Sequence, residues 1–177
     1  LAAAAAGLAA GLDLADVAAA LSAAEPRSRW RMELEARDDG VLILNDAYNA
    51  NPDSMAVGLD ALMQLTRTSR EKHAHARAIA VLGDMLELGP EAAELHRDLG
   101  RRAAEAGVAE VVAVGGLADE VAAGAAACGT LARVAERDIV AGSLTLTPGD
   151  VVLVKGSRGV GLEKVAAELI ARDGGAS

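Results

Sequence analysis

Residues 41–55 read VLILNDAYNANPDSM. The four aliphatic residues from Val41 to Leu44 predict a buried strand, and a cluster of polar side chains follows them directly. Pro52 then favours the first turn of a helix. A strand that ends in polar side chains just before a helix is where open α/β folds bind their ligands. This stretch therefore predicts both the class of fold and the place of a binding site.

The residues before this stretch predict a hairpin. Apolar and charged side chains alternate over residues 32–37, which is typical of a half-exposed strand. Asp38-Asp39-Gly40 then gives a hairpin turn signal. The strand at 41–44 is therefore expected to pair antiparallel with the segment 32–37 and to enter a buried sheet.

The residues after this stretch alternate between helix and strand patterns. Apolar runs predict strands at 78–82, 111–114, 131–134 and 151–154. Helices are expected at 52–66, at 90–106, around 121–125, from 138, and at 162–171, with a polar loop over 68–77. Continuous apolar strands that alternate with helices predict a parallel sheet covered on both faces. We expect an α/β, Rossmann-like three-layer domain with a mostly parallel sheet and an N-terminal antiparallel hairpin strand.

The N-terminal residues predict a separate helical part. Residues 1–21 favour two short helices joined at Gly11-Leu12-Asp13, with Asp13 as the N-cap of the second. The pair Glu25-Pro26 is expected to end that helix, because the residue before proline avoids the α region. We divide the chain into residues 1–25 and residues 26–177. Since the sequence does not begin with methionine, we expect it to start inside a larger protein.

Composition narrows the classes of function. The 177 residues are 52% hydrophobic but include one Trp, one Tyr and no Phe, so the core must be aliphatic. The formal net charge of −9 argues against non-specific nucleic-acid binding, which needs a basic surface. No apolar run is long enough to predict membrane insertion. Cys128 is the one cysteine and is expected to be buried, and no Cys/His cluster predicts a metal site in this chain.

Polar or glycine-rich residues follow four of the predicted strands. Because the carboxyl ends of parallel strands share one edge of the sheet, these segments should line one crevice. They are residues 46–51, 83–85, 115–116 and 155–159. Lys155 ends an apolar strand, and its ammonium suits a carboxylate or a phosphate. Two alternatives stay open: residues 156–161 form a phosphate loop or a tight turn, and Asp46 binds a ribose or caps the following helix.

Several motifs resemble those of the Mur ligases, over essentially the whole chain. They are DAYNANPDSM at 46–55, VLGDMLELG at 81–89, His96, and VLVKGSR at 152–158. The resemblance implies that residues 1–25 are the helical end of the central, ATP-binding domain and that residues 26–177 are the C-terminal domain. Related ligases carry Ala-His where this chain has Tyr48-Asn49. This difference favours the member that joins D-Ala-D-Ala to the UDP-MurNAc-tripeptide.

The resemblance also implies a reaction and a cellular place. The reaction is an ATP-dependent C–N ligation in bacterial peptidoglycan synthesis, which proceeds through an acyl phosphate in the cytoplasm. ATP and Mg²⁺ would be bound mostly by the upstream central domain, because this chain has no GxxxxGK[S/T] phosphate loop. The resemblance therefore implies no catalytic residue within this chain, and the fragment alone is expected to be inactive.

The resemblance assigns roles to seven residues. Arg31, or Arg29 as the alternative, would reach the ATP phosphates, Asp46 would bind the ribose, and Tyr48 and Asn49 would lie beside the nucleotide. The peptide side of the cleft would be formed by Lys155, Ser157 and Arg158. Two other functions stay open: a nucleotide-binding or interaction module without catalysis, and a sibling Mur ligase with another amino-acid substrate.

Overall fold

The computed structural model describes residues 2–22 and 29–172. Strands in this part are β1 (Glu33–Ala36), β2 (Leu42–Asp46), β3 (Ala78–Gly83), β4 (Glu110–Val114), β5 (Leu131–Val134) and β6 (Val151–Lys155). The α-helices are α1 (Ala2–Ala9), α2 (Leu14–Ser22), α3 (Pro52–Arg70), α4 (Ala92–Ala106), α5 (Ala118–Ala127), α6 (Arg137–Ser143) and α7 (Glu163–Ala171). Two short 3-10 turns, η1 (Gly89–Glu91) and η2 (Arg158–Val160), follow the β3 and β6 loops.

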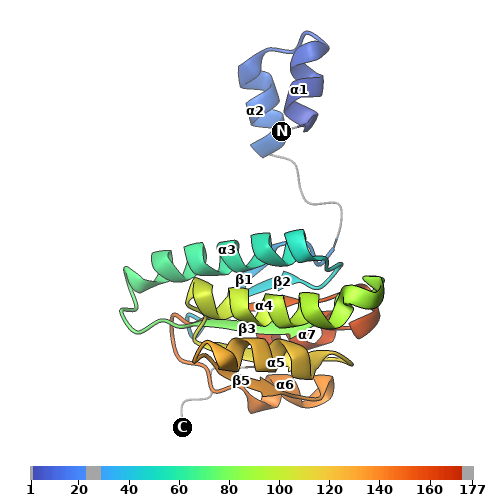
Figure 1. The fold of residues 1–177 in the computed structure, drawn as a ribbon. Helices are drawn as coiled ribbons and strands as arrows, with labels where there is room; N and C mark the ends of the chain where they lie inside the picture. The colour runs from blue at the N-terminus through green and yellow to red at the C-terminus, as the bar shows by residue number, and fades with distance from the viewer. Residues whose placement is uncertain (1, 23–28, 173–177) are drawn as a thin grey trace.

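The strands of the described residues form one sheet in the order β1-β2-β6-β3-β4-β5. Only β1 runs antiparallel, to β2, and the other neighbours are parallel. The last strand in sequence, β6, therefore inserts between β2 and β3 at the centre of the sheet (Figure 1). In this register Asp46 of β2 lies opposite Lys155 of β6.

Helices cover both faces of the sheet and create two aliphatic cores. Alternate residues of each central strand point to opposite faces, so Leu153 enters one core and Val152 the other. The first core is completed by α3, α4 and α5, and the second by α6 and α7. Both cores consist of Ala, Val, Leu, Ile and Met side chains, as the lack of aromatic residues requires. The predicted α/β class and the N-terminal hairpin are confirmed.

The helices α1 and α2 form a small pair of their own at the N-terminus (Figure 1). Val17 of α2 is buried against Gly7 of α1. The backbone N–H of Ala15 donates to the Asp13 carboxylate at 2.9 Å, so Asp13 caps α2 as predicted. The predicted stop at Glu25-Pro26 lies outside the described residues.

Two local predictions were wrong. The helix expected to end near Thr66 continues to Arg70, because the residues between them have no breaker and Ser69 packs inward. The Ser69 hydroxyl donates to the Gly149 carbonyl at 2.6 Å. Cys128 is exposed rather than buried, because it lies at the C-terminal end of α5, past the last turn that contacts the sheet. Among the described residues, no helix combines the length and hydropathy needed to cross a membrane.

Candidate functional site

A buried ion pair marks the carboxyl edge of the sheet. The Lys155 ammonium lies 2.5 Å from Asp46 Oδ2, and the relative exposures of the two side chains are 2% and 12%. The same ammonium donates to the Asn49 carbonyl at 2.9 Å. Asp46 Oδ1 accepts from the backbone N–H of Met32 at 3.1 Å. The carboxylate therefore joins β6 to the segment that leads into β1.

The local sequence explains how the loop between β2 and α3 is held. Asn51 is the N-cap of α3 and forms a capping box with Ser54, with N–H···O distances of 2.8 and 3.0 Å. Pro52 takes the first helical position, where its missing N–H has no cost. Residues 47–51 are thus fixed between the strand and a well-capped helix, with the exposed Asn49 at the surface.

The chain's single Trp and single Tyr both lie at this edge, Tyr48 beside Arg31 and Arg158 and Trp30 beside Arg158. The Arg31 guanidinium carbon is 4.1 Å from the centre of the Tyr48 ring, and that of Arg158 is 5.8 Å from the same ring. Arg158 is also 5.8 Å from the centre of the Trp30 ring. Cation–π contacts of this kind orient a guanidinium without neutralising its charge.

The segment that carries Arg31 has an uncommon backbone. Trp30 and Met32, on either side of it, have φ angles of 61° and 51°. A bulky residue with positive φ is strained and persists only where surrounding contacts hold it. Here the Tyr48 N–H donates to the Trp30 carbonyl at 3.1 Å, and Met32 is held by Asp46. These two contacts fix Arg31 beside the end of β2.

An open pocket of about 340 Å³, which we call the β2–β6 pocket, lies at this edge of the sheet. Its lining consists of Arg31, Met32, Asp46, Tyr48, Asn49, Asn51, Ser54, Val57 and Lys155. It offers cationic groups, hydrogen-bonding groups and an aromatic ring. In the described part of the chain, neither Arg31 nor Arg158 pairs with a carboxylate. Such a set suits a phosphorylated, hydroxylated ligand.

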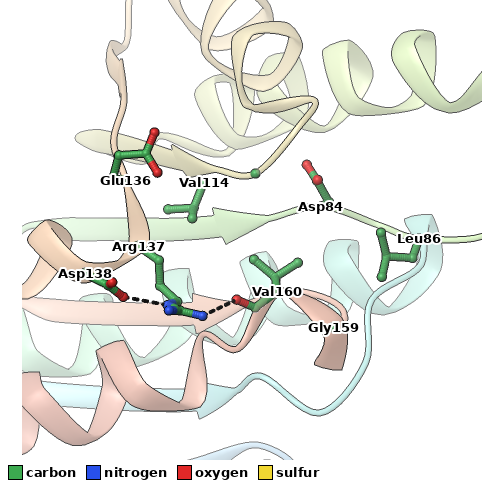
Figure 2. Close-up of a pocket in the computed structure, with 9 residues that line it drawn as sticks. Asp84, Leu86, Val114, Glu136, Arg137, Asp138, Gly159 and Val160 are labelled. Carbon is green, nitrogen blue, oxygen red and sulfur yellow. Dashed lines mark hydrogen bonds and ion pairs between the residues drawn. The ribbon is translucent and has the colours of Figure 1, made fainter.

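A second cavity, of about 390 Å³, lies along the same edge between the ends of β3, β4 and β5 (Figure 2). Asp84 accepts from the N–H groups of Gly116 and Leu117 at 2.7 and 3.0 Å, which ties the β3 loop to the start of α5. Arg137 donates to Asp138 at 2.8 Å and to the Val160 carbonyl at 3.5 Å. The four strand ends therefore line two pockets, and the single crevice expected from the sequence was wrong.

The loop after β6 separates the two pockets. Ser157 is buried, its N–H donates to the Asp84 carbonyl at 2.9 Å, and its hydroxyl accepts from the Leu86 N–H at 2.9 Å. Gly161 has a φ of 76°, and a Cβ on Gly156 would lie 3.0 Å from the Cα of Gly83. The turn alternative therefore accounts for the glycines at 156 and 161.

The buried His96 supports the loop that follows β3. Its Nε2 accepts from the Met85 N–H at 2.9 Å, and its Nδ1 lies 2.7 Å from the Ala92 carbonyl. Because a carbonyl oxygen can only accept, Nδ1 is the donor to Ala92, and Nε2 is the acceptor from Met85. His96 is therefore a structural support for the loop that carries Asp84, whose Oδ1 lies 3.9 Å from His96 Nε2.

The structure brings the residues predicted for ATP together. Arg31, Asp46, Tyr48 and Asn49 all line the β2–β6 pocket, whereas Arg29 is exposed and outside its lining. Of the residues predicted for the peptide side, Lys155 lines this same pocket, Arg158 contacts Tyr48, and Ser157 lies in the dividing loop. Sequence reasoning missed Glu136, Arg137 and Asp138 of the second pocket. The available signal was their position directly after the predicted strand at 131–134.

Comparison with known proteins gives the family of this chain. The family model described as "Mur ligase, glutamate ligase domain" matches residues 30–158. The chain belongs to the Mur ligase family. The matched residues of this Mur ligase chain include the β2–β6 pocket and most of the second pocket.

The relatives that match this chain are longer proteins. The chain is 43% identical, over 192 aligned residues, to the UDP-N-acetylmuramoyl-tripeptide–D-alanyl-D-alanine ligase of Mycobacterium tuberculosis. That match covers 98% of this chain and 37% of the ligase. The crystal structure of MurF from Acinetobacter baumannii matches with a TM-score of 0.73 and 27% identity, over 94% of this chain and 35% of that one. MurF from Thermotoga maritima in complex with ADP matches with a TM-score of 0.65 and 24% identity, over 92% and 35%.

Proposed function

We propose that this chain is the C-terminal part of an ATP-dependent ligase that joins D-Ala-D-Ala to the UDP-MurNAc-tripeptide. Membership of the Mur ligase family supports the class of reaction, and similarity to the M. tuberculosis ligase supports the substrates. The observation that carries the proposal is the β2–β6 pocket, where the residues predicted to contact ATP lie together. Residues 1–25 would then be the end of the central domain and residues 26–177 the C-terminal domain.

The chemistry of the β2–β6 pocket supports a nucleotide as its ligand. Arg31 would reach the phosphates, and the neighbouring Arg158 adds a second guanidinium on the same ring. Asp46 keeps lone pairs for ribose hydroxyls, since each of its oxygens accepts one hydrogen bond from the described residues. Tyr48 and Asn49 would lie beside the base or the sugar. Lys155 lines the β2–β6 pocket and Arg158 lies over the Tyr48 ring, so we propose that both act on the nucleotide side, and we keep the peptide-side role for Ser157.

The pocket residues do not fit Mg²⁺. The Lys155 ammonium, 2.5 Å from Asp46 Oδ2, occupies the position that a cation would need. Mg²⁺ prefers carboxylate and water oxygens that are free of a competing cation. We therefore assign Mg²⁺ and the phosphate loop to the upstream central domain of the same polypeptide, which would meet this domain when the enzyme closes.

The proposed reaction has two steps. The terminal carboxylate of the tripeptide takes the γ-phosphoryl group of ATP, which gives an acyl phosphate and ADP. The amine of D-Ala-D-Ala then attacks the carbonyl carbon. The C–N bond forms, the C–O bond to phosphate breaks, and the amine loses a proton. Arg31 and Arg158 would contribute by neutralising charge on the phosphates, because phosphoryl transfer depends mostly on positioning and charge stabilisation. We propose the bacterial cytoplasm as the location of the enzyme.

A chimeric enzyme tests this proposal. This chain replaces the matched segment of the M. tuberculosis ligase, and ADP release is measured with all substrates and with each one omitted. We expect ADP release to require both the UDP-tripeptide and D-Ala-D-Ala, because the two domains together form one site. The purified 177-residue chain should release no ADP. ADP release with a single amino acid in place of D-Ala-D-Ala would indicate a sibling ligase, and nucleotide binding without turnover would indicate a binding module.

A further inference from the structure

Lys155 is the largest fully buried side chain among the described residues, although it carries a charge. Only 2% of it is exposed, and its neighbours Leu153 and Val154 belong to the two aliphatic cores. Removing an ammonium from water is costly, so a buried lysine needs partners of good geometry. A methionine would fill the same volume without this cost. The charge of Lys155 therefore calls for an explanation beyond packing.

A glycine in α3 makes room for the stem of this side chain. A Cβ built on Gly58 would lie 3.0 Å from Lys155 Cδ, 3.6 Å from its Cε and 3.4 Å from Leu153 Cδ2. Gly58 is itself buried in the interior of a 19-residue helix. Glycine destabilises a helix interior relative to alanine. Its presence here gives Lys155 a channel between the sheet and α3.

This channel ends at the β2–β6 pocket. The ammonium contacts Asp46 Oδ2 at 2.5 Å and the Asn49 carbonyl at 2.9 Å. These contacts join β6 to the end of β2 and to the loop before α3. Through Asp46 Oδ1 they extend to Met32, next to Arg31. One side chain thus restrains three residues to which we assign nucleotide contacts.

We propose that Lys155 is a positioning residue for nucleotide binding, and that Gly58 keeps its path open. The ammonium orients the Asp46 carboxylate so that its free lone pairs face the pocket, and it fixes the loop that presents Asn49. This inference rests on the proposed function for its kinetic consequence. The contacts of Lys155 with Asp46, Asn49 and Gly58 do not depend on the proposed function.

The kinetic test uses the active ligase with Lys155→Met, a change that keeps volume and removes the charge. We expect the KM for ATP to rise on the order of tenfold, the cost of one charged hydrogen bond, with the KM for D-Ala-D-Ala unchanged. In an Asp46→Asn background the same change should add little, because the two residues act through one contact. A full tenfold effect in that background would show that Lys155 does not act through Asp46.

Gly58→Ala tests the channel with Lys155 retained. Its Cβ should displace the lysine stem, so we expect a smaller rise in the KM for ATP in the same direction. Gly142→Ala is the matched control, because Gly142 lies in α6 and a Cβ there meets nothing within 4 Å. A loss of stability in Lys155→Met with all KM values unchanged would make Lys155 a structural residue only.

A second measurement separates this inference from the proposed function. Failure of the wild-type enzyme to ligate the substrates would remove the proposed function and leave the geometry to be tested. In the same ligand-free protein, Lys155→Met should shift the NMR resonances of the Asn49 amide and the Asp46 side chain, whereas Gly142→Ala should not. Unchanged resonances at both residues in Lys155→Met would overturn the positioning role, whatever the activity.

Discussion

Gly100→Ala is expected to lower the free energy of unfolding by about 3 kcal/mol, at the upper end of the cost of overpacking. The reason is the close approach of α4 and α5. A Cβ on Gly100 would lie 2.0 Å from the Val121 carbonyl oxygen and 2.7 Å from the Ala125 nitrogen. Both are backbone atoms of α5, which cannot rotate away as a flexible side chain can. Urea denaturation followed by circular dichroism measures the change.

Gly124 of the facing helix, α5, makes a matching close contact with α4. A Cβ on Gly124 of α5 would lie 2.0 Å from the Arg97 carbonyl oxygen of α4, so Gly124→Ala should cost about as much as Gly100→Ala, about 3 kcal/mol. Gly142→Ala again serves as the control, because it adds the same methyl group in a helix with open space around it. Equal stability of the Gly100 and Gly142 variants would contradict the close contact between α4 and α5.

Asp46→Ala is expected to lower the free energy of unfolding by about 3–5 kcal/mol, because it leaves the buried Lys155 ammonium without a counter-charge. The Met32 N–H would lose its acceptor as well. Asp46→Asn should cost less, since its amide oxygen can still accept one hydrogen bond. Thermal or urea unfolding measures the stability of the three proteins, which should decrease from the wild type to Asp46→Asn and then to Asp46→Ala.

The control for this prediction is another ion-paired aspartate in an exposed position. Asp138 pairs with Arg137 at 2.8 Å, but its side chain is 79% exposed. Solvent screens such a pair, so Asp138→Ala should leave stability unchanged within the error of the measurement. A similar loss in the two alanine variants would show that burial of the Asp46–Lys155 pair does not determine its contribution.

The elements of the fold could be predicted because each carries a local signal. The alternation at 32–37, the turn at 38–40 and the apolar runs give the hairpin and the parallel strands directly. The order of the strands has no such signal. The strand β6 comes last in the chain and pairs with β2, so nothing near Asp46 in sequence indicates that Lys155 lies opposite it.

The candidate site was predictable to the same extent. Arg31, Asp46, Tyr48 and Asn49 lie within one stretch of sequence, and the structure brings them into one pocket. Lys155 and Arg158 were predicted for the peptide side, and the structure places Lys155 in the lining of the β2–β6 pocket and Arg158 over the Tyr48 ring. Their position could not be read from the sequence, because side-chain direction at a strand end depends on neighbouring strands. The pairing of Asp46 with a buried cation and the channel past Gly58 are consequences of packing between distant segments.

Arg31→Ala in the active ligase tests most directly whether the β2–β6 pocket binds the nucleotide. Loss of one charged phosphate contact should raise the KM for ATP on the order of tenfold or more and leave the KM for D-Ala-D-Ala unchanged. Arg29→Ala, two residues earlier and outside the pocket lining, is the control and should change neither value. An unchanged KM for ATP in Arg31→Ala, or a rise confined to D-Ala-D-Ala, would contradict the assignment of this pocket to ATP.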